Sequence, residues 1–527
     1  MPGLTIDTVP VEAPEGTTIL EAAKTAGIQI PHLCYHPSLK IVGTCRLCLV
    51  EVESMPKLQT ACSTEVRDGM VVRTKSSKVQ KARRGVLEFL LINHPLDCPV
   101  CDQAGECDLQ DYTFDYGAAQ SRYAEQKRRY PRQEIGPKIV RDMNRCVHCT
   151  RCVRFCRDVI SIEEYGVFER GAQTTVGTYV DAALQNNYQG SLVELCPVGA
   201  LTSRDFRFKS RVWHLHSVES ICPGCSRGCN IEIDFRNHTV YRFRARENDG
   251  VNSWWMCDEG RVSYRSVNNS DRILKPLRKA NGQETVVGFD EALSFVAETL
   301  QKIVKEHGPE SVGGIASSTC TNEENYLFGQ FFREVLGSKN VDFIQAGRGE
   351  GYSDNILIQA DKSPNSRGAR EMGVAAREGG LSVEGMMGAA RDSKLKALYV
   401  MGQDLVARLR GDARVKEALD GLELLVVQDT NMNETAKLAH IVLPKASFAE
   451  MEGTFTNFEG RVQRIRPAFQ HDDVWPGWKT LSALAEKMGR QFGYRSAEQV
   501  FDEIARNVQE YRGLSYDKIG CQGVKVR

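Results

Sequence analysis

The chain has 527 residues, and its 68 lysines and arginines balance 68 aspartates and glutamates, so its formal net charge is zero. This length predicts several domains, and the balance gives no reason to expect a nucleic-acid or anionic-membrane partner. No run approaches the roughly 18 apolar residues of a membrane helix. The N-terminus lacks a secretory signal, so the sequence predicts a soluble, cytoplasmic protein.

Cysteine spacing is the most informative feature of the sequence. Of the 18 cysteines, all but two lie between Cys34 and Cys257. In a reducing compartment such clusters favour metal ligation over disulfides, and thiolates select iron–sulfur clusters, zinc or Cu(I). The spacing predicts four sets: Cys34, Cys45, Cys48 and Cys62; His94, Cys98, Cys101 and Cys107; Cys146, Cys149, Cys152 and Cys196; and Cys222, Cys225, Cys229 and Cys257.

Residues 1–78 are predicted to form a small β-rich module with one helix. Strands are expected at 4–7 and 49–53, and the capping box Thr18–Glu21 opens a helix that Gly27 can end. The first set shares its close cysteine pair and distant fourth cysteine with plant-type [2Fe–2S] ferredoxins, although its first gap is longer. Spacing alone leaves zinc open, whereas Gly43 favours a cluster because backbone N–H groups must approach the sulfurs.

The second set follows an amphipathic helix that is expected from about Ser77 to Asn93 and to end at Pro95. His94 stands at that end, ahead of three cysteines. Imidazole can replace a thiolate on a cluster iron, so His94 is the expected fourth ligand. A zinc site with three thiolates and one imidazole is the alternative. The basic residues from 120 to 145 are interpreted as a solvated connection.

The third set begins with Cys146-x2-Cys149-x2-Cys152-x3-Cys156, the spacing of bacterial ferredoxins, whose fourth cysteine serves a second cluster. That second cluster has lost its ligands here, because Asn186, Gln189 and Leu192 stand at the expected positions. Cys196 therefore completes the third set, and Cys156 is predicted to be a spare thiol in the core.

In the fourth set, three cysteines lie close together and one lies far away, with Pro223, Gly224 and Gly228 suited to tight loops. A zinc ribbon would prefer two C-x2-C pairs. From about residue 285 the pattern is that of an α/β protein, with a helix from Phe289, buried strands at 395–400 and 422–427, and a helix near 412–420. Residues 347–351 are Gly-rich, but no strand is expected before them, so a mobile loop is favoured over a phosphate-binding loop. Cys320 and Cys521 are predicted to be unligated.

Residues 1–275 closely resemble the large iron–sulfur subunit family of bacterial respiratory complex I, and also the electron-input subunits of NAD-linked hydrogenases and formate dehydrogenases. The C-terminal half resembles molybdopterin oxidoreductases. The motifs that carry these resemblances are 34–37, 43–52, 94–107, 145–156 and 196–201 for the first, and Asp271–Leu277, Cys320–Tyr326 and Glu452–Gln463 for the second.

The resemblance implies an α+β and α/β multidomain fold with one [2Fe–2S] cluster on the first set and one [4Fe–4S] cluster on each of the others. The implied domains are a ferredoxin-like β-grasp at 1–78, a one-His three-Cys domain at 79–118, a [4Fe–4S] ferredoxin-like domain at 139–210, a further [4Fe–4S] domain at 215–275, and a molybdopterin-oxidoreductase-like scaffold at 276–527. No molybdenum is expected, because no thiol occurs in Phe343–Arg348, where formate dehydrogenases carry the metal's ligand.

The expected function is an electron relay within NADH–quinone oxidoreductase, with no catalytic residue or dinucleotide site of its own. The implied partners are an NADH/FMN-binding subunit and other peripheral-arm subunits, which would hold the chain on the cytoplasmic side of the cell membrane. The alternative is the same role in a hydrogenase or formate dehydrogenase complex. A free-standing molybdenum enzyme and a zinc-bound assembly protein are the competing classes.

Overall fold

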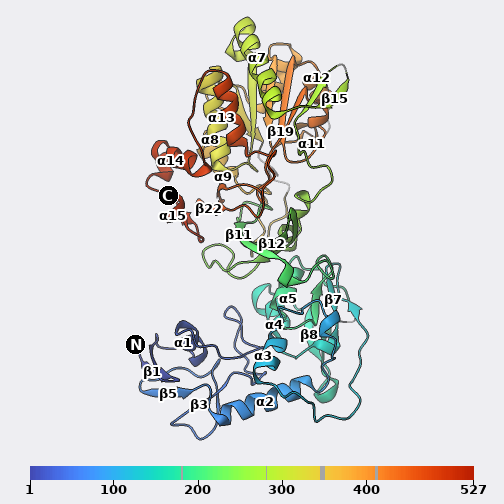
Figure 1. Ribbon diagram of the computed structural model, residues 1–527, viewed down its shortest axis with the longest axis vertical. Coiled ribbons are helices and arrows are strands. Elements are labelled where there is room, and N and C mark those ends of the chain that lie inside the picture. The colour runs from blue at the N-terminus through green and yellow to red at the C-terminus, as the bar shows by residue number, and fades with distance from the viewer. Residues whose placement is uncertain (180–181, 281, 345–350, 410–412, 527) are drawn as a thin grey trace. The chain divides into compact units, whose positions relative to one another are not determined.

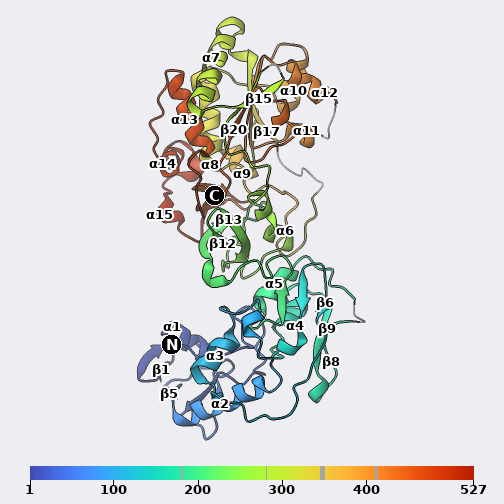
Figure 2. The same ribbon diagram turned by 45° about the vertical axis from the view of Figure 1, so that its right-hand side comes forward.

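The computed structural model describes residues 1–179, 182–280, 282–344, 351–409 and 413–526. These residues form two compact units, one from Met1 to Leu215 and one from His216 onward, which Figure 1 and Figure 2 show in two views. Among the residues described, no helix is both long and apolar enough to cross a membrane.

The first unit begins with a mixed five-stranded sheet in the order β2-β1-β5-β3-β4. Its strands are β1 (Gly3–Ile6), β2 (Val9–Glu12), β3 (Leu49–Val52), β4 (Gln59–Thr60) and β5 (Met70–Arg73). β1 and β5 are parallel, and the other pairs are antiparallel. Alternate side chains of β1 and β3 are buried and pack with helix α1 (Ile19–Thr25) in one apolar core.

Local signals in this module are confirmed. The predicted capping box is present, because the Thr18 side chain accepts from the Glu21 N–H and the Glu21 side chain faces the Thr18 N–H. Gly27 has a φ of 71°, which is the left-handed conformation that ends helices. Helix α2 (Ser77–Leu91) starts at the predicted residue and ends two residues early.

The rest of the first unit consists of short elements that carry the second and third cysteine sets. Its helices are α3 (Asp108–Tyr116), α4 (Arg151–Arg154), which continues into a π-helical turn (Phe155–Val159), and α5 (Gln189–Leu195). Its strands are β6 (Gln133–Glu134), β7 (Ile139–Arg141) and β10 (Leu201–Ser203) in one sheet, and β8 (Tyr165–Phe168) with β9 (Thr175–Thr178) in another. Its 3₁₀ turns are Cys98–Val100, Met143–Arg145, Gly171–Gln173 and Val212–His214.

The second unit begins with an antiparallel sheet that carries the fourth cysteine set on its connections. It contains β11 (His216–Ile221), β12 (Asn230–Arg236) and β13 (Thr239–Ala245), followed by the short helix α6 (Asp258–Arg261) and a 3₁₀ turn at Ser263–Ser266.

A seven-stranded sheet in the order β15-β14-β20-β19-β18-β16-β17 forms the centre of this unit. β16 (Val312–Ser317), β17 (Val341–Ile344), β18 (Ala397–Met401), β19 (Leu424–Asp429) and β20 (Ile441–Pro444) are parallel, whereas β14 (Leu277–Ala280) and β15 (Gln283–Val286) form an antiparallel edge. The order of the parallel strands is that of a doubly wound α/β sheet.

Helices cover both faces of this sheet (Figure 1, Figure 2). α7 (Phe289–His307), α8 (Asn322–Gln330), α13 (Gly477–Lys487) and α14 (Ala497–Asn507) pack on one face, and α10 (Val383–Arg391) and α12 (Ala413–Asp420) pack on the other. The smaller elements are β21 (Gly453–Thr456), β22 (Arg461–Ile465), β23 (Val524–Lys525), α9 (Ser366–Glu371), α11 (Leu405–Arg408), α15 (Tyr516–Ile519), a π-helical turn (Phe331–Leu336) and 3₁₀ turns at Pro309–Ser311, Ala436–Leu438 and Gln509–Tyr511.

The predicted helix from Phe289, the two buried strands and the helix between them are confirmed as α7, β18, β19 and α12. One local expectation is wrong: strand β17 ends at Ile344, shortly before the Gly-rich segment, where no strand is expected from the sequence. β17 pairs in parallel with β16, and its four residues show no clear alternation of apolar and polar side chains. Most of the Gly-rich segment, and of the stretch Phe343–Arg348 in which no thiol occurs, lies outside the described residues.

Candidate metal centres

The four cysteines of the first set lie together in the core of the N-terminal module. Each is at most 8% exposed. The thiols interact in two pairs, and within each pair the interaction lowers the pKa of one thiol and raises that of the other. The pKa of Cys34 is lowered and that of Cys45 raised, and the pKa of Cys48 is lowered and that of Cys62 raised. The backbone N–H of Leu33 points at the Cys45 sulfur, 3.5 Å away. Gly43 has a φ of 62°, so its lack of a Cβ allows the turn there.

Three thiols of the second set lie close enough to influence one another electrostatically. Cys98 contributes to the raised pKa of Cys101, and Cys101 contributes to the raised pKa of Cys107. Cys101 and Cys107 are buried, whereas Cys98 is exposed. Burial lowers the pKa of His94 to about 4, so its imidazole is neutral, as a metal ligand must be. His94 shares two electrostatic neighbours with Cys101, namely Asp97 and Arg145.

The four thiols of the third set line one pocket. Cys146, Cys149, Cys152 and Cys196 all contribute to its wall, together with apolar side chains such as Tyr165 and Val176. Burial raises the pKa of Cys146 and of Cys196 to about 12. Thiols this buried ionise only with a compensating positive charge, which metal binding supplies.

Cys156 lies in the core and is fully buried, as predicted, and it is not among the residues that line the cavity of the third set. Burial raises its pKa to about 12. A low thiolate content and low exposure are typical of an inert structural cysteine.

The four thiols of the fourth set line a second pocket, together with Met256 and Gly260. Backbone N–H groups of Gly224 and Gly260 lie 3.4 Å from the sulfurs of Cys222 and Cys257. A Cβ at Gly260 would lie 2.9 Å from the Cys222 sulfur, so only glycine allows this close approach. Soft donors, four thiols in a site and backbone donors aimed at sulfur fit an iron–sulfur cluster.

Among the described residues, no group of three or more His, Cys, Asp and Glu side chains could hold a metal ion in the conformation seen. Four thiols instead line the cavity of the third set and that of the fourth. Of the two cysteines predicted to be unligated, Cys320 is buried and Cys521 is exposed, and neither lines the cavity of the third or the fourth set.

Three buried arginines, Arg145, Arg151 and Arg154, connect the cysteine sets of the first unit, and sequence reasoning missed their role. Arg145 pairs with Asp97, beside the second set, and with Asp142, near the third. Arg151 donates to the carbonyls of Tyr35 and Leu195, at 2.6 and 3.4 Å. All three arginines belong to the ferredoxin run 145–156, but a sequence does not reveal that an arginine is buried.

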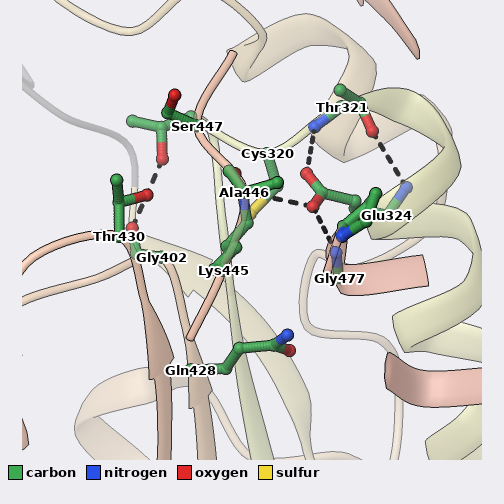
Figure 3. A network of polar contacts seen from close by, with 12 residues as sticks. Cys320, Thr321, Glu324, Gly402, Gln428, Thr430, Lys445, Ala446, Ser447 and Gly477 are labelled. Atoms are coloured by element: carbon green, nitrogen blue, oxygen red, sulfur yellow. Dashed lines mark hydrogen bonds and ion pairs between the residues drawn. The ribbon is translucent and has the colours of Figure 1, made fainter. Parts of the chain in front are cut away.

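One landmark segment of the C-terminal half, Cys320–Tyr326, takes part in a buried polar network at the start of α8 (Figure 3). Thr321 caps α8 in a reciprocal box with Glu324. Glu324 also accepts from the Gly477 N–H at 2.8 Å and pairs with Lys445 at 3.1 Å. Cys320 lies beside this pair, and burial raises the pKa of its thiol. The network joins α8 to the segment after β20 and to the start of α13.

Five family models match the chain in sequence. They are a 2Fe-2S iron-sulfur cluster binding domain (residues 3–77), the NADH-ubiquinone oxidoreductase-G iron-sulfur binding region (83–122), the ferredoxin-like domain of NADH-quinone oxidoreductase subunit 3 (136–202), the molybdopterin oxidoreductase Fe4S4 domain (215–269) and molybdopterin oxidoreductase (272–366 and 363–487). The chain therefore has domains of the 2Fe-2S and 4Fe-4S binding families, in the expected α+β multidomain arrangement.

Curated relatives give the same assignment. The NADH-ubiquinone oxidoreductase 75 kDa subunit of Reclinomonas americana is 42% identical over 361 residues, which are 68% of this chain and 52% of that protein. The NADH-quinone oxidoreductase G subunit of Rickettsia bellii is 42% identical over 342 residues, which are 65% of this chain and 49% of that protein. This chain belongs to the family of these large iron–sulfur subunits. It spans about half the length of the two relatives.

The solved structures include an NAD⁺-reducing [NiFe]-hydrogenase chain that is 30% identical to this protein, with coverage of 40% of this chain and 91% of that one. Its TM-score of 0.37 is too low to bear on fold or function.

Proposed function

We propose that this member of the family is an iron–sulfur electron-transfer subunit of an NADH–quinone oxidoreductase. It would take electrons from an NADH/FMN-binding partner and pass them towards quinone. The observation that carries the proposal is the presence of four separate groups of soft ligands on one chain, because a relay needs several one-electron sites. The chain would contribute to the oxidoreductase as a subunit, without a substrate site of its own.

The proposed ligands are those of the four sets, with the [2Fe–2S] cluster on Cys34, Cys45, Cys48 and Cys62 and a [4Fe–4S] cluster on each of the others. When bound, the clusters supply reversible one-electron chemistry. The protein holds the ligands, aims backbone N–H groups at sulfur and excludes water, and these factors set reduction potentials. No molybdenum is expected. Partner subunits would place the chain peripherally on the cytoplasmic side of the membrane.

An iron and sulfide assay tests this proposal. One two-iron and three four-iron clusters give about fourteen irons and as many acid-labile sulfides per chain, measured on full-length protein purified without oxygen. The isolated chain should be reduced by dithionite but not by NADH, and adding the flavin-binding partner should make reduction by NADH possible. Four zincs with little iron, or molybdenum with formate oxidation, would contradict the proposal.

Replacing His94 by Ala should perturb the second cluster alone. His94 supplies the only imidazole of the four sets, and imidazole ligands raise cluster potentials. Electron paramagnetic resonance of the dithionite-reduced variant should show one altered or missing [4Fe–4S] signal and an unchanged [2Fe–2S] signal.

Cys156→Ala is the matched control for this experiment, because it removes a buried thiol that lies outside the proposed sets. It should retain about fourteen irons and every signal. An unchanged spectrum for His94→Ala would make His94 a helix-end residue, and loss of a cluster in Cys156→Ala would mean that the third set is assigned wrongly.

A further inference from the structure

Arg154 joins the first and third cysteine sets through one buried guanidinium. It lies at the end of α4, two residues after Cys152, and is 2% exposed. One terminal nitrogen, Nη2, donates to the carbonyl of Cys34 at 2.5 Å and to the carbonyl of Cys149 at 3.1 Å. The other, Nη1, donates to the carbonyl of Lys40 at 2.6 Å. A proposed ligand of each of two clusters is thus held by the same side chain.

The partners of Arg154 determine its electrostatic effect. Its three hydrogen bonds all go to backbone carbonyls, which carry no net charge. Cys34, Cys149 and Cys152 are among the groups that interact electrostatically with the guanidinium. An arginine remains protonated in proteins, and its charge is weakly screened where water is excluded. Arg145, in contrast, is paired with two carboxylates.

We propose that Arg154 is a positioning and potential-setting residue shared by the first and third clusters. This inference rests on the proposed function. Reduction adds one negative charge to a cluster, and a nearby buried cation stabilises that reduced state. Arg154 therefore raises the reduction potential of both clusters, and its hydrogen bonds hold the Cys34 and Cys149 loops in fixed register, which favours electron transfer between them.

The test is a redox titration of the full chain followed by electron paramagnetic resonance, with Arg154→Gln as the variant. The midpoint potentials of the first and third clusters should both fall by about 59 mV. For a one-electron couple this shift corresponds to about a tenfold change in the oxidised-to-reduced ratio at a fixed potential. The potentials of the second and fourth clusters should stay unchanged. Arg154→Lys retains the charge and should restore most of the shift.

Arg157→Gln is the matched control, because Arg157 lies one turn further along the same segment, is exposed and pairs with Asp158. It should leave all potentials unchanged. If Arg154→Gln assembles its clusters and they keep wild-type potentials, the inference is overturned while the proposed relay stands. An equal shift in the potentials of all four clusters would overturn it as well. If Arg154→Gln loses clusters, Arg154→Lys decides: wild-type potentials support the inference, and renewed loss assigns Arg154 to folding alone. Absence of iron from the wild-type chain would instead reject the proposed function.

Discussion

Lys445→Met should lower the free energy of unfolding of the C-terminal unit by about 3–5 kcal/mol, the usual cost of breaking a buried ion pair. The Lys445 ammonium lies 3.1 Å from Glu324, and the two side chains are 5% and 0% exposed. Burial alone would lower the pKa of Lys445, but the attraction of Glu324 raises it above its ordinary value. Methionine fills a similar volume but leaves the Glu324 carboxylate buried without a counter-charge.

The experiment is urea unfolding of the full chain followed by tryptophan fluorescence. Two of the five tryptophans, Trp475 and Trp478, contribute from beside this network, where the Ala446 N–H donates to the Trp475 carbonyl. Adding Glu324→Gln to Lys445→Met should recover part of the loss, because a neutral amide needs no counter-charge and its oxygen can still accept from the Gly477 N–H. The exposed pair Lys394–Asp392 provides the control, and Lys394→Met should change stability by less than about 0.5 kcal/mol. Equal effects of the two lysine substitutions would show that burial of the pair contributes nothing.

Gly199→Ala should remove the second cluster from most chains, with a loss of about four irons per chain. Gly199 follows Cys196 by three residues, and a Cβ there would overlap the sulfur of Cys101 and lie 3.2 Å from Cβ of Gln103. A free thiol can rotate away from such a clash, whereas a thiol fixed as a metal ligand cannot. The substitution therefore asks whether Cys101 is held in place.

Iron analysis and electron paramagnetic resonance measure this outcome, with loss of one [4Fe–4S] signal and retention of the [2Fe–2S] signal. Gly85→Ala is the control, because a Cβ at that position of α2 meets no atom within 4 Å. It should retain every cluster and stabilise the helix by about 0.5–1 kcal/mol. Full iron content in Gly199→Ala would mean that Cys101 is free to move and is not a ligand.

The close spacing of the ligands was readable from the sequence because cluster ligation constrains short segments. Two residues separate Cys146 from Cys149, and two separate Cys149 from Cys152. A loop this short brings its thiols to one site independently of how the rest of the chain folds. The capping box Thr18–Glu21 was predictable for the same reason, since both of its partners lie within one helical turn. Membership of the large iron–sulfur subunit family follows from such local motifs.

Which distant residues meet depends on how the elements pack. Arg154 and Cys34 are 120 residues apart, and Glu324 meets Lys445 only because α8 and the segment after β20 lie at the same end of the sheet. The strand β17 likewise forms because it pairs with β16, a partner that its own sequence does not reveal. Local patterns carry information about bonds within a turn or a loop, whereas burial of a charge is decided by how elements pack. A buried arginine and an exposed one therefore look identical in the sequence, and only packing makes Arg154 a connection between two proposed clusters.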